Sequence, residues 1–107
     1  MNFKEMASKI GVDEVDFKEL LEMMVDVSIV DINNFETELA VGNYLGSAMA
    51  AHSIKGAAGN LGLTDIFTVA AELEKAAKMS DQSQMAEKIA FLKQQLKTLS
   101  EELSKKS

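Results

Sequence analysis

Apolar residues recur at the 3.6-residue spacing of an α-helix along almost the whole chain of 107 residues. No stretch alternates apolar and polar residues as a half-buried strand would, and the chain contains no proline. The helical pattern is broken at four short stretches that contain glycine or turn-forming polar residues: 11–13, 40–43, 59–64 and 80–81. The sequence therefore predicts five helices joined by short turns.

The predicted helices span about residues 3–10, 13–39, 43–61, 64–79 and 81–104, with Asp13 and Thr64 as N-caps. In the last segment the apolar residues are spaced alternately by four and three positions, which is the a/d pattern of helices packed at shallow angles. They are Met85, Ile89, Leu92, Leu96, Leu99 and Leu103. The core face of the second segment should carry Phe17, Leu21, Met24, Val25, Ser28, Ile32, Phe35 and Leu39, and that of the fourth Ile66, Phe67, Ala70, Leu73 and Ala77.

The expected fold is all-α: an antiparallel up-down four-helix bundle with a short extra N-terminal helix. A chain of this length suits a single domain, covering residues 1–107. Turns of two to five residues make neighbouring helices antiparallel. The N-terminal helix should occupy residues 1–11 and the bundle residues 13–104.

Composition excludes several classes of function. The net charge is −6 and all 11 basic residues are lysines, so the chain lacks the basic stripe and arginine forks that nucleic acids and nucleotide phosphates call for. It has no cysteine and one histidine, so we expect no bound metal. No apolar run approaches the length of a membrane span, and the first ten residues do not resemble a secretory signal, so a cytoplasmic location is expected.

The third predicted helix carries the one histidine, His52, in unusual surroundings. Residues 40–64 contain no Asp or Glu, although the chain has 17 acidic residues, and Lys55 is the only formal charge there. On a helical wheel His52 lies opposite the core positions Ile54 and Leu61. Alanine or glycine occupies the positions four residues before, four after and seven after it: Ala48, Gly56 and Gly59. The pattern predicts an exposed imidazole on a cleared surface, with an ammonium group one turn away.

A phosphoryl group would suit this setting. Imidazole has an ordinary pKa of about 6.5, so its neutral form offers a nucleophilic lone pair at neutral pH. Once phosphorylated it carries about two negative charges, and a lysine at about 4 Å offers on the order of 4 kcal/mol of attraction before desolvation is subtracted. Two simpler interpretations remain: His52 as an ordinary solvated side chain, and the glycines as markers of a close helix crossing.

The stretch from Ala51 to Gly62, AHSIKGAAGNLG, resembles the signature of the histidine phosphotransfer (HPt) domains of two-component phosphorelays. That signature is a histidine followed by Lys-Gly at the third and fourth positions, on the second helix of a four-helix bundle. The resemblance implies that His52 is the phosphoacceptor through its Nε2 atom, that Lys55 stabilises the phosphoryl group, and that Gly56 provides clearance for a receiver domain. It also implies no kinase activity, no cofactor bound by this chain, and Mg²⁺ held by the partner receiver.

The implied partners are receiver domains of response regulators or hybrid histidine kinases. Apolar residues of the second helix that have no place in the core stripe are expected beside His52, and with their neighbours on the third helix they would form a docking surface. The predicted docking residues are Met23, Val27, Val30, Leu45, Ala48, Met49 and Gly59. The alternative is that the short N-terminal helix covers Met23, Val27 and Val30.

Two other functions remain open from the sequence: a phosphoacceptor domain from a larger sensor or chemotaxis kinase, and a non-catalytic helical adaptor. A monomer is expected, although the a/d seam of the last helix would also serve a dimer.

Overall fold

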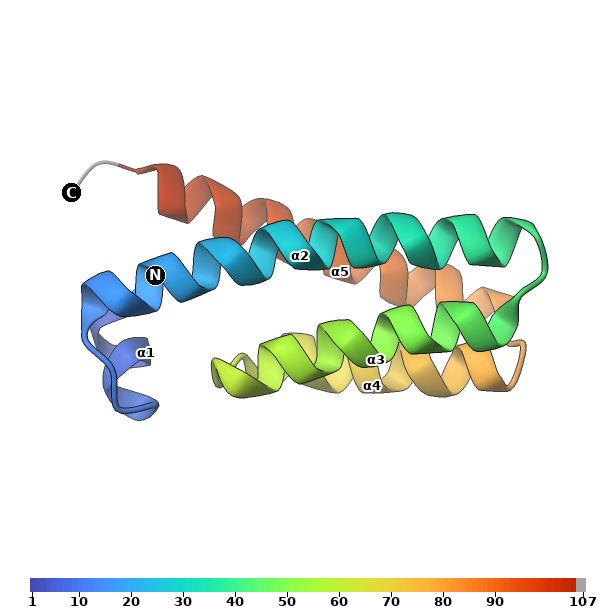
Figure 1. Cartoon of the computed structure of the whole chain (residues 1–107), viewed down its shortest axis with the longest axis horizontal. Coiled ribbons are helices and arrows are strands. Elements are labelled where there is room, and N and C mark those ends of the chain that lie inside the picture. Colours follow the sequence, from blue (N-terminus) through green and yellow to red (C-terminus); the bar gives the residue numbers. More distant parts are fainter. Residues whose placement is uncertain (106–107) are drawn as a thin grey trace.

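Five α-helices make up the fold in the computed structural model, which describes residues 1–105. The last two residues of the predicted domain, 106 and 107, lie outside the described part. The helices are α1 (Phe3–Lys9), α2 (Glu14–Ala40), α3 (Tyr44–Asn60), α4 (Thr64–Lys78) and α5 (Gln82–Ser104) (Figure 1). Residues 1–105 contain no strand, so the all-α prediction is confirmed.

The turns between helices share one hydrogen-bonding pattern. The second residue beyond each of the helices α1 to α4 has a left-handed backbone, with Gly42 at φ 76° and Gly62 at φ 69° as examples. After α2, the Gly42 amide donates to the Leu39 carbonyl and the Asn43 amide donates to the Glu38 carbonyl. These two bonds define a Schellman motif, and equivalent bonds close α1, α3 and α4. The turn after α4 places Ser80 in the left-handed position, at φ 54°, where the others have glycine.

Side-chain caps begin four of the five helices. Asp13 accepts a hydrogen bond from the Asp16 amide at 2.8 Å, which confirms its predicted role at the start of α2. The prediction of Thr64 as the cap of α4 is wrong, because the N-cap is Leu63 and makes no side-chain bond. Thr64 is instead the first residue of α4, and its hydroxyl donates to the Gly62 carbonyl rather than accepting from an amide of α4.

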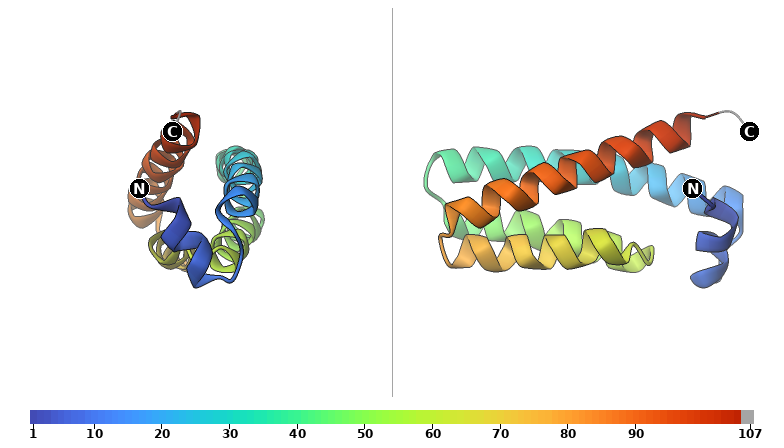
Figure 2. Two further views of the ribbon diagram at one scale, coloured as in Figure 1. Left: turned by 90° about the vertical axis from the view of Figure 1, so that its left-hand side faces the viewer. Right: turned by 180° about the vertical axis from the view of Figure 1, so that it is seen from behind.

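The helices α2 to α5 lie side by side along the long axis of the molecule (Figure 1). Each packs against the next in sequence, and α5 also packs against α2, so the four surround a common core (Figure 2). The predicted core faces of α2 and α5 are buried except for the partly buried ends, Leu39 and Leu103. In α4 the prediction for Phe67 is wrong: its side chain is 41% exposed, because the ring lies against Gly59 on the surface of α3.

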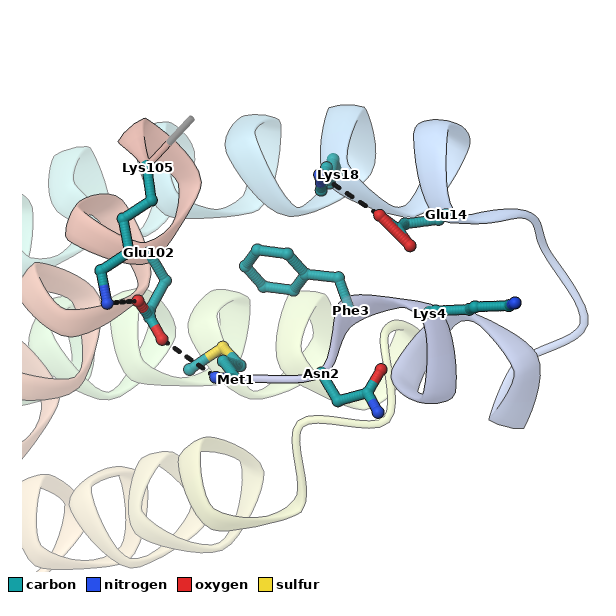
Figure 3. A pocket seen from close by; sticks show the side chains of 8 residues that line it. All are labelled: Met1, Asn2, Phe3, Lys4, Glu14, Lys18, Glu102 and Lys105. Atoms are coloured by element: carbon teal, nitrogen blue, oxygen red, sulfur yellow. Dashed lines mark hydrogen bonds and ion pairs between the residues drawn. The ribbon is translucent and has the colours of Figure 1, made fainter. Parts of the chain in front are cut away.

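The short helix α1 packs against the N-terminal part of α2, at one end of the molecule (Figure 2). The rings of Phe3 and Phe17 are 6.2 Å apart, and the Lys18 ammonium lies 5.7 Å from the Phe3 ring centre. The Met1 amine forms an ion pair with Glu102 of α5 at 3.1 Å, and both residues line a pocket together with Phe3 and Lys18 (Figure 3). These contacts hold α1 at the end of the molecule, away from the middle of α2.

Candidate functional site

The His52 side chain projects from α3 and is 64% exposed. Its neighbours on the inner side of the helix, Ala51 and Ile54, are completely buried. A helix that buries one face must present the opposite face to solvent, so the core contacts of α3 determine the direction of the imidazole.

One carboxylate from the neighbouring helix contacts the imidazole. Oε2 of Glu74, on α4, lies 3.1 Å from Nδ1 of His52. The same carboxylate binds two lysines: Oε1 is 2.9 Å from Nζ of Lys55, and Oε2 is 3.3 Å from Nζ of Lys78. The acid-free surroundings expected from the sequence therefore hold along α3 only, because α4 places an acid directly beside the ring.

The Glu74 carboxyl is well shielded, with a side chain only 12% exposed. Burial raises the pKa of Glu74, but hydrogen bonds and charge attraction from Lys55 and Lys78 outweigh it and hold the pKa below its ordinary value. The carboxylate is therefore ionised at neutral pH and accepts hydrogen bonds from all three neighbours.

Ionised Glu74 determines which ring nitrogen of His52 is free. A carboxylate only accepts hydrogen bonds, so the His52 Nδ1 atom beside it must carry the proton. In the neutral ring the lone pair then lies on Nε2. An exposed imidazole with a free Nε2 is suited to attack an electrophile carried by a large partner.

Gly56 follows His52 by one turn and borders open space. A Cβ atom built at Gly56 would meet no atom within 4 Å outside its own helix and chain neighbours. At Gly59, in contrast, a Cβ atom would lie 3.2 Å from Cδ2 of Phe67. The close-crossing interpretation thus applies to Gly59, which packs against α4, and not to Gly56.

Of the seven predicted docking residues, five are well exposed, Gly59 packs against Phe67 of α4, and Ala48 is buried. Met23, Val27, Val30, Leu45 and Met49 are each at least half exposed, and α1 does not cover those on α2. A hydrogen bond of 2.6 Å from Ser53 to Asp31 joins α3 to this stretch of α2 next to His52. The inclusion of Ala48 is wrong, because it is 1% exposed and faces the interior. The helical-wheel prediction assumed that α3 has a single core-facing side, whereas α3 packs against both α2 and α4.

Sequence reasoning missed Glu74 and Lys78 as site residues. The two are four residues apart on one helix, a spacing that by itself indicates only a local ion pair. Nothing in the sequence of α4 signals that Glu74 reaches the imidazole on α3, so the packing of the two helices was required to find it.

The described residues contain no obvious metal centre or membrane segment. Within residues 1–105, no group of three or more His, Cys, Asp or Glu side chains is arranged to hold a metal ion. No helix in this range is long and apolar enough to cross a membrane.

An exposed histidine on an all-helical domain, held by a carboxylate and followed by Lys-Gly, defines the class of a histidine phosphoacceptor domain. The family model described as Hpt domain matches residues 19–103, and the chain belongs to this family. Histidine phosphotransfer in phosphorelay signalling is the activity that membership implies, with receiver domains as the class of partner. No curated protein and no solved structure matches the chain.

Proposed function

We propose that this chain is a phosphocarrier, in which Nε2 of His52 accepts a phosphoryl group from the aspartyl phosphate of one receiver domain and passes it to another. The main support is the contact of 3.1 Å between Nδ1 and Glu74, which leaves Nε2 free on a ring that is 64% exposed. We interpret the fold as an antiparallel up-down four-helix bundle, which the short turns and the closed arrangement of α2 to α5 support. We propose a monomer acting in the cytoplasm.

The transfer step follows from the tautomer of His52. The Nε2 lone pair forms a bond to phosphorus while the bond from phosphorus to the aspartyl oxygen breaks, and the departing carboxylate keeps that electron pair. The Nδ1 proton stays on the ring, which becomes a phosphorylated imidazolium. Ionised Glu74 stabilises the positive charge that develops on the ring, and the protonated ring remains a good leaving group for onward transfer.

Lys55 and Gly56 have separate roles in this proposal. The Lys55 ammonium stabilises the phosphoryl oxygens, and the absence of a side chain at Gly56 lets the partner surface reach Nε2. Catalytic Mg²⁺ would be held by the receiver, and no step depends on a metal bound by this chain.

Loss of the phosphoacceptor tests the function directly. Incubation with a phosphorylated receiver should transfer label to the wild-type protein as an acid-labile, alkali-stable phosphohistidine. The His52→Gln variant should take up none while keeping its helix content, because the side chain is exposed. Label that persists in this variant would refute the assignment and favour the adaptor interpretation.

The docking surface is proposed to consist of Met23, Val27 and Val30 on α2 with Leu45 and Met49 on α3. Apolar surface next to a reactive group is typical of a protein interface, and a methionine-containing surface tolerates more than one partner. We expect Val27→Asp to slow transfer from the receiver. Val15→Asp is the matched control, because Val15 is 68% exposed on the same helix but lies near its α1 end. Equal slowing by both variants would contradict the proposed surface.

A further inference from the structure

Lys55 already forms an ion pair with Glu74 in the unphosphorylated protein. Its ammonium lies 2.9 Å from Oε1 of Glu74, and its side chain is 26% exposed. To neutralise a phosphoryl group on His52, the ammonium must turn away from this oxygen. Glu74 is then short of a cation, and because its side chain is only 12% exposed, water is a poor replacement.

A second ammonium group is bound to the same carboxylate. Nζ of Lys78 lies 3.3 Å from Oε2, the oxygen that also contacts Nδ1 of His52. Lys78 is on the same helix as Glu74, one turn further on, so its contact does not depend on the position of Lys55. The carboxylate therefore has one lysine at each oxygen, and one of them can leave without removing all compensating charge.

We propose that Lys78 is a positioning residue that releases Lys55 for the phosphoryl group. When phosphate is attached to Nε2, Lys55 moves from Oε1 of Glu74 to the phosphoryl oxygens, while Lys78 and the Nδ1 proton keep Glu74 paired. Without Lys78, Glu74 retains Lys55 and the phosphoryl group loses its counter-ion. This inference rests on the proposed phosphorylation of His52.

The size of the effect follows from the exposure of Lys78, whose side chain is 59% accessible. Exposed ion pairs are worth up to about 1 kcal/mol, so losing Lys78 should shorten the lifetime of phosphohistidine about two- to fivefold. The replacement should not alter the ring tautomer, because Glu74 still accepts the hydrogen bond from Nδ1–H.

The experiment uses phosphoramidate as a small phosphodonor for the full chain and follows phosphohistidine decay by ³¹P NMR. We expect Lys78→Met to shorten the lifetime and Lys78→Arg to preserve it. The control is Lys75→Met, on the same helix, since Lys75 makes no ion pair within residues 1–105. Lys55→Met should also shorten the lifetime, and adding Lys78→Met to it should have little further effect. The ¹⁵N shifts of the unphosphorylated ring should remain those of the Nδ1–H tautomer in Lys78→Met.

Three results would overturn the inference alone: a wild-type lifetime in Lys78→Met, an equal further loss when Lys78→Met is added to Lys55→Met, or an altered ring tautomer. In each of these cases the wild-type protein is still phosphorylated on His52. If phosphoramidate does not label the wild-type protein, a phosphorylated receiver is used to label it and the same decay is followed. Failure of both donors to phosphorylate His52 would instead refute the proposed function, and this inference with it.

Discussion

Replacing Gly56 by leucine should make the protein more stable and less active. Gly56 lies in the interior of α3, four residues from its last residue, and a Cβ atom there meets nothing within 4 Å beyond its own helix. The fold therefore has no steric reason for glycine at this position. The function proposed above supplies one, because any side chain would stand between the imidazole and an approaching receiver.

The expected gain in stability comes from helix propensity. Glycine in a helix interior is about 1 kcal/mol less favourable than alanine, and leucine is close to alanine, so Gly56→Leu should raise the free energy of unfolding by about 0.8 kcal/mol. For a domain of about this size, that corresponds to an increase in Tm of about 3–6 °C. The leucine would be exposed, so no gain from core packing is included.

Two properties of the Gly56→Leu variant should change in opposite directions. They are the Tm, measured by circular dichroism during heating, and the rate of transfer from a phosphorylated receiver. We expect Tm to rise and the transfer rate to fall at least tenfold, which corresponds to about 1.4 kcal/mol in the barrier. Gly59→Ala is the matched control: its Cβ would lie 3.2 Å from Phe67, so its gain in Tm should be smaller. A destabilised Gly56→Leu would show that Gly56 serves packing, and an unchanged transfer rate would show that clearance is irrelevant.

Two further predictions concern stability. The pKa of Glu74 is lowered in the folded protein. The ion pairs of Glu74 therefore stabilise the fold at pH values above the ordinary pKa of a glutamate, and this contribution disappears as the pH falls through the lowered pKa. Glu74→Gln should therefore cost about 1 kcal/mol in urea unfolding at neutral pH and almost nothing near pH ~2; an equal cost at both would contradict the ion-pair explanation. Ser80 has a left-handed backbone that costs a non-glycine residue about 1 kcal/mol, so Ser80→Gly should raise the free energy of unfolding by about 0.5–1 kcal/mol. A lower Tm for this variant would show that the Ser80 side chain makes a contribution of its own.

Local features of the sequence were sufficient to predict the helices. Helical periodicity, glycine-containing turns and the Asp13 cap depend on residues near one another in the chain, and the observed helices begin and end within about two residues of the predicted limits. The errors arose where neighbouring helices decide the environment. Phe67 shares the apolar character of the core residues of α4 but lies over Gly59, and Ala48 is buried on a helix that packs against two neighbours rather than one.

In the candidate site, too, features carried by a single helix could be predicted, whereas contacts between helices could not. An imidazole opposite the core positions, followed by Lys55 and Gly56, could be recognised from the sequence because one helix carries all three, and helix geometry fixes their relative directions. The carboxylate that orients the ring comes from α4, 22 residues further along the chain. Its contact with His52 and Lys55 exists only because α3 and α4 pack side by side, and such a contact has no periodic signature in either helix. The resemblance to the family implied Nε2 as the reactive atom, but only the tertiary structure showed the carboxylate that holds Nδ1 and the charges that surround the ring.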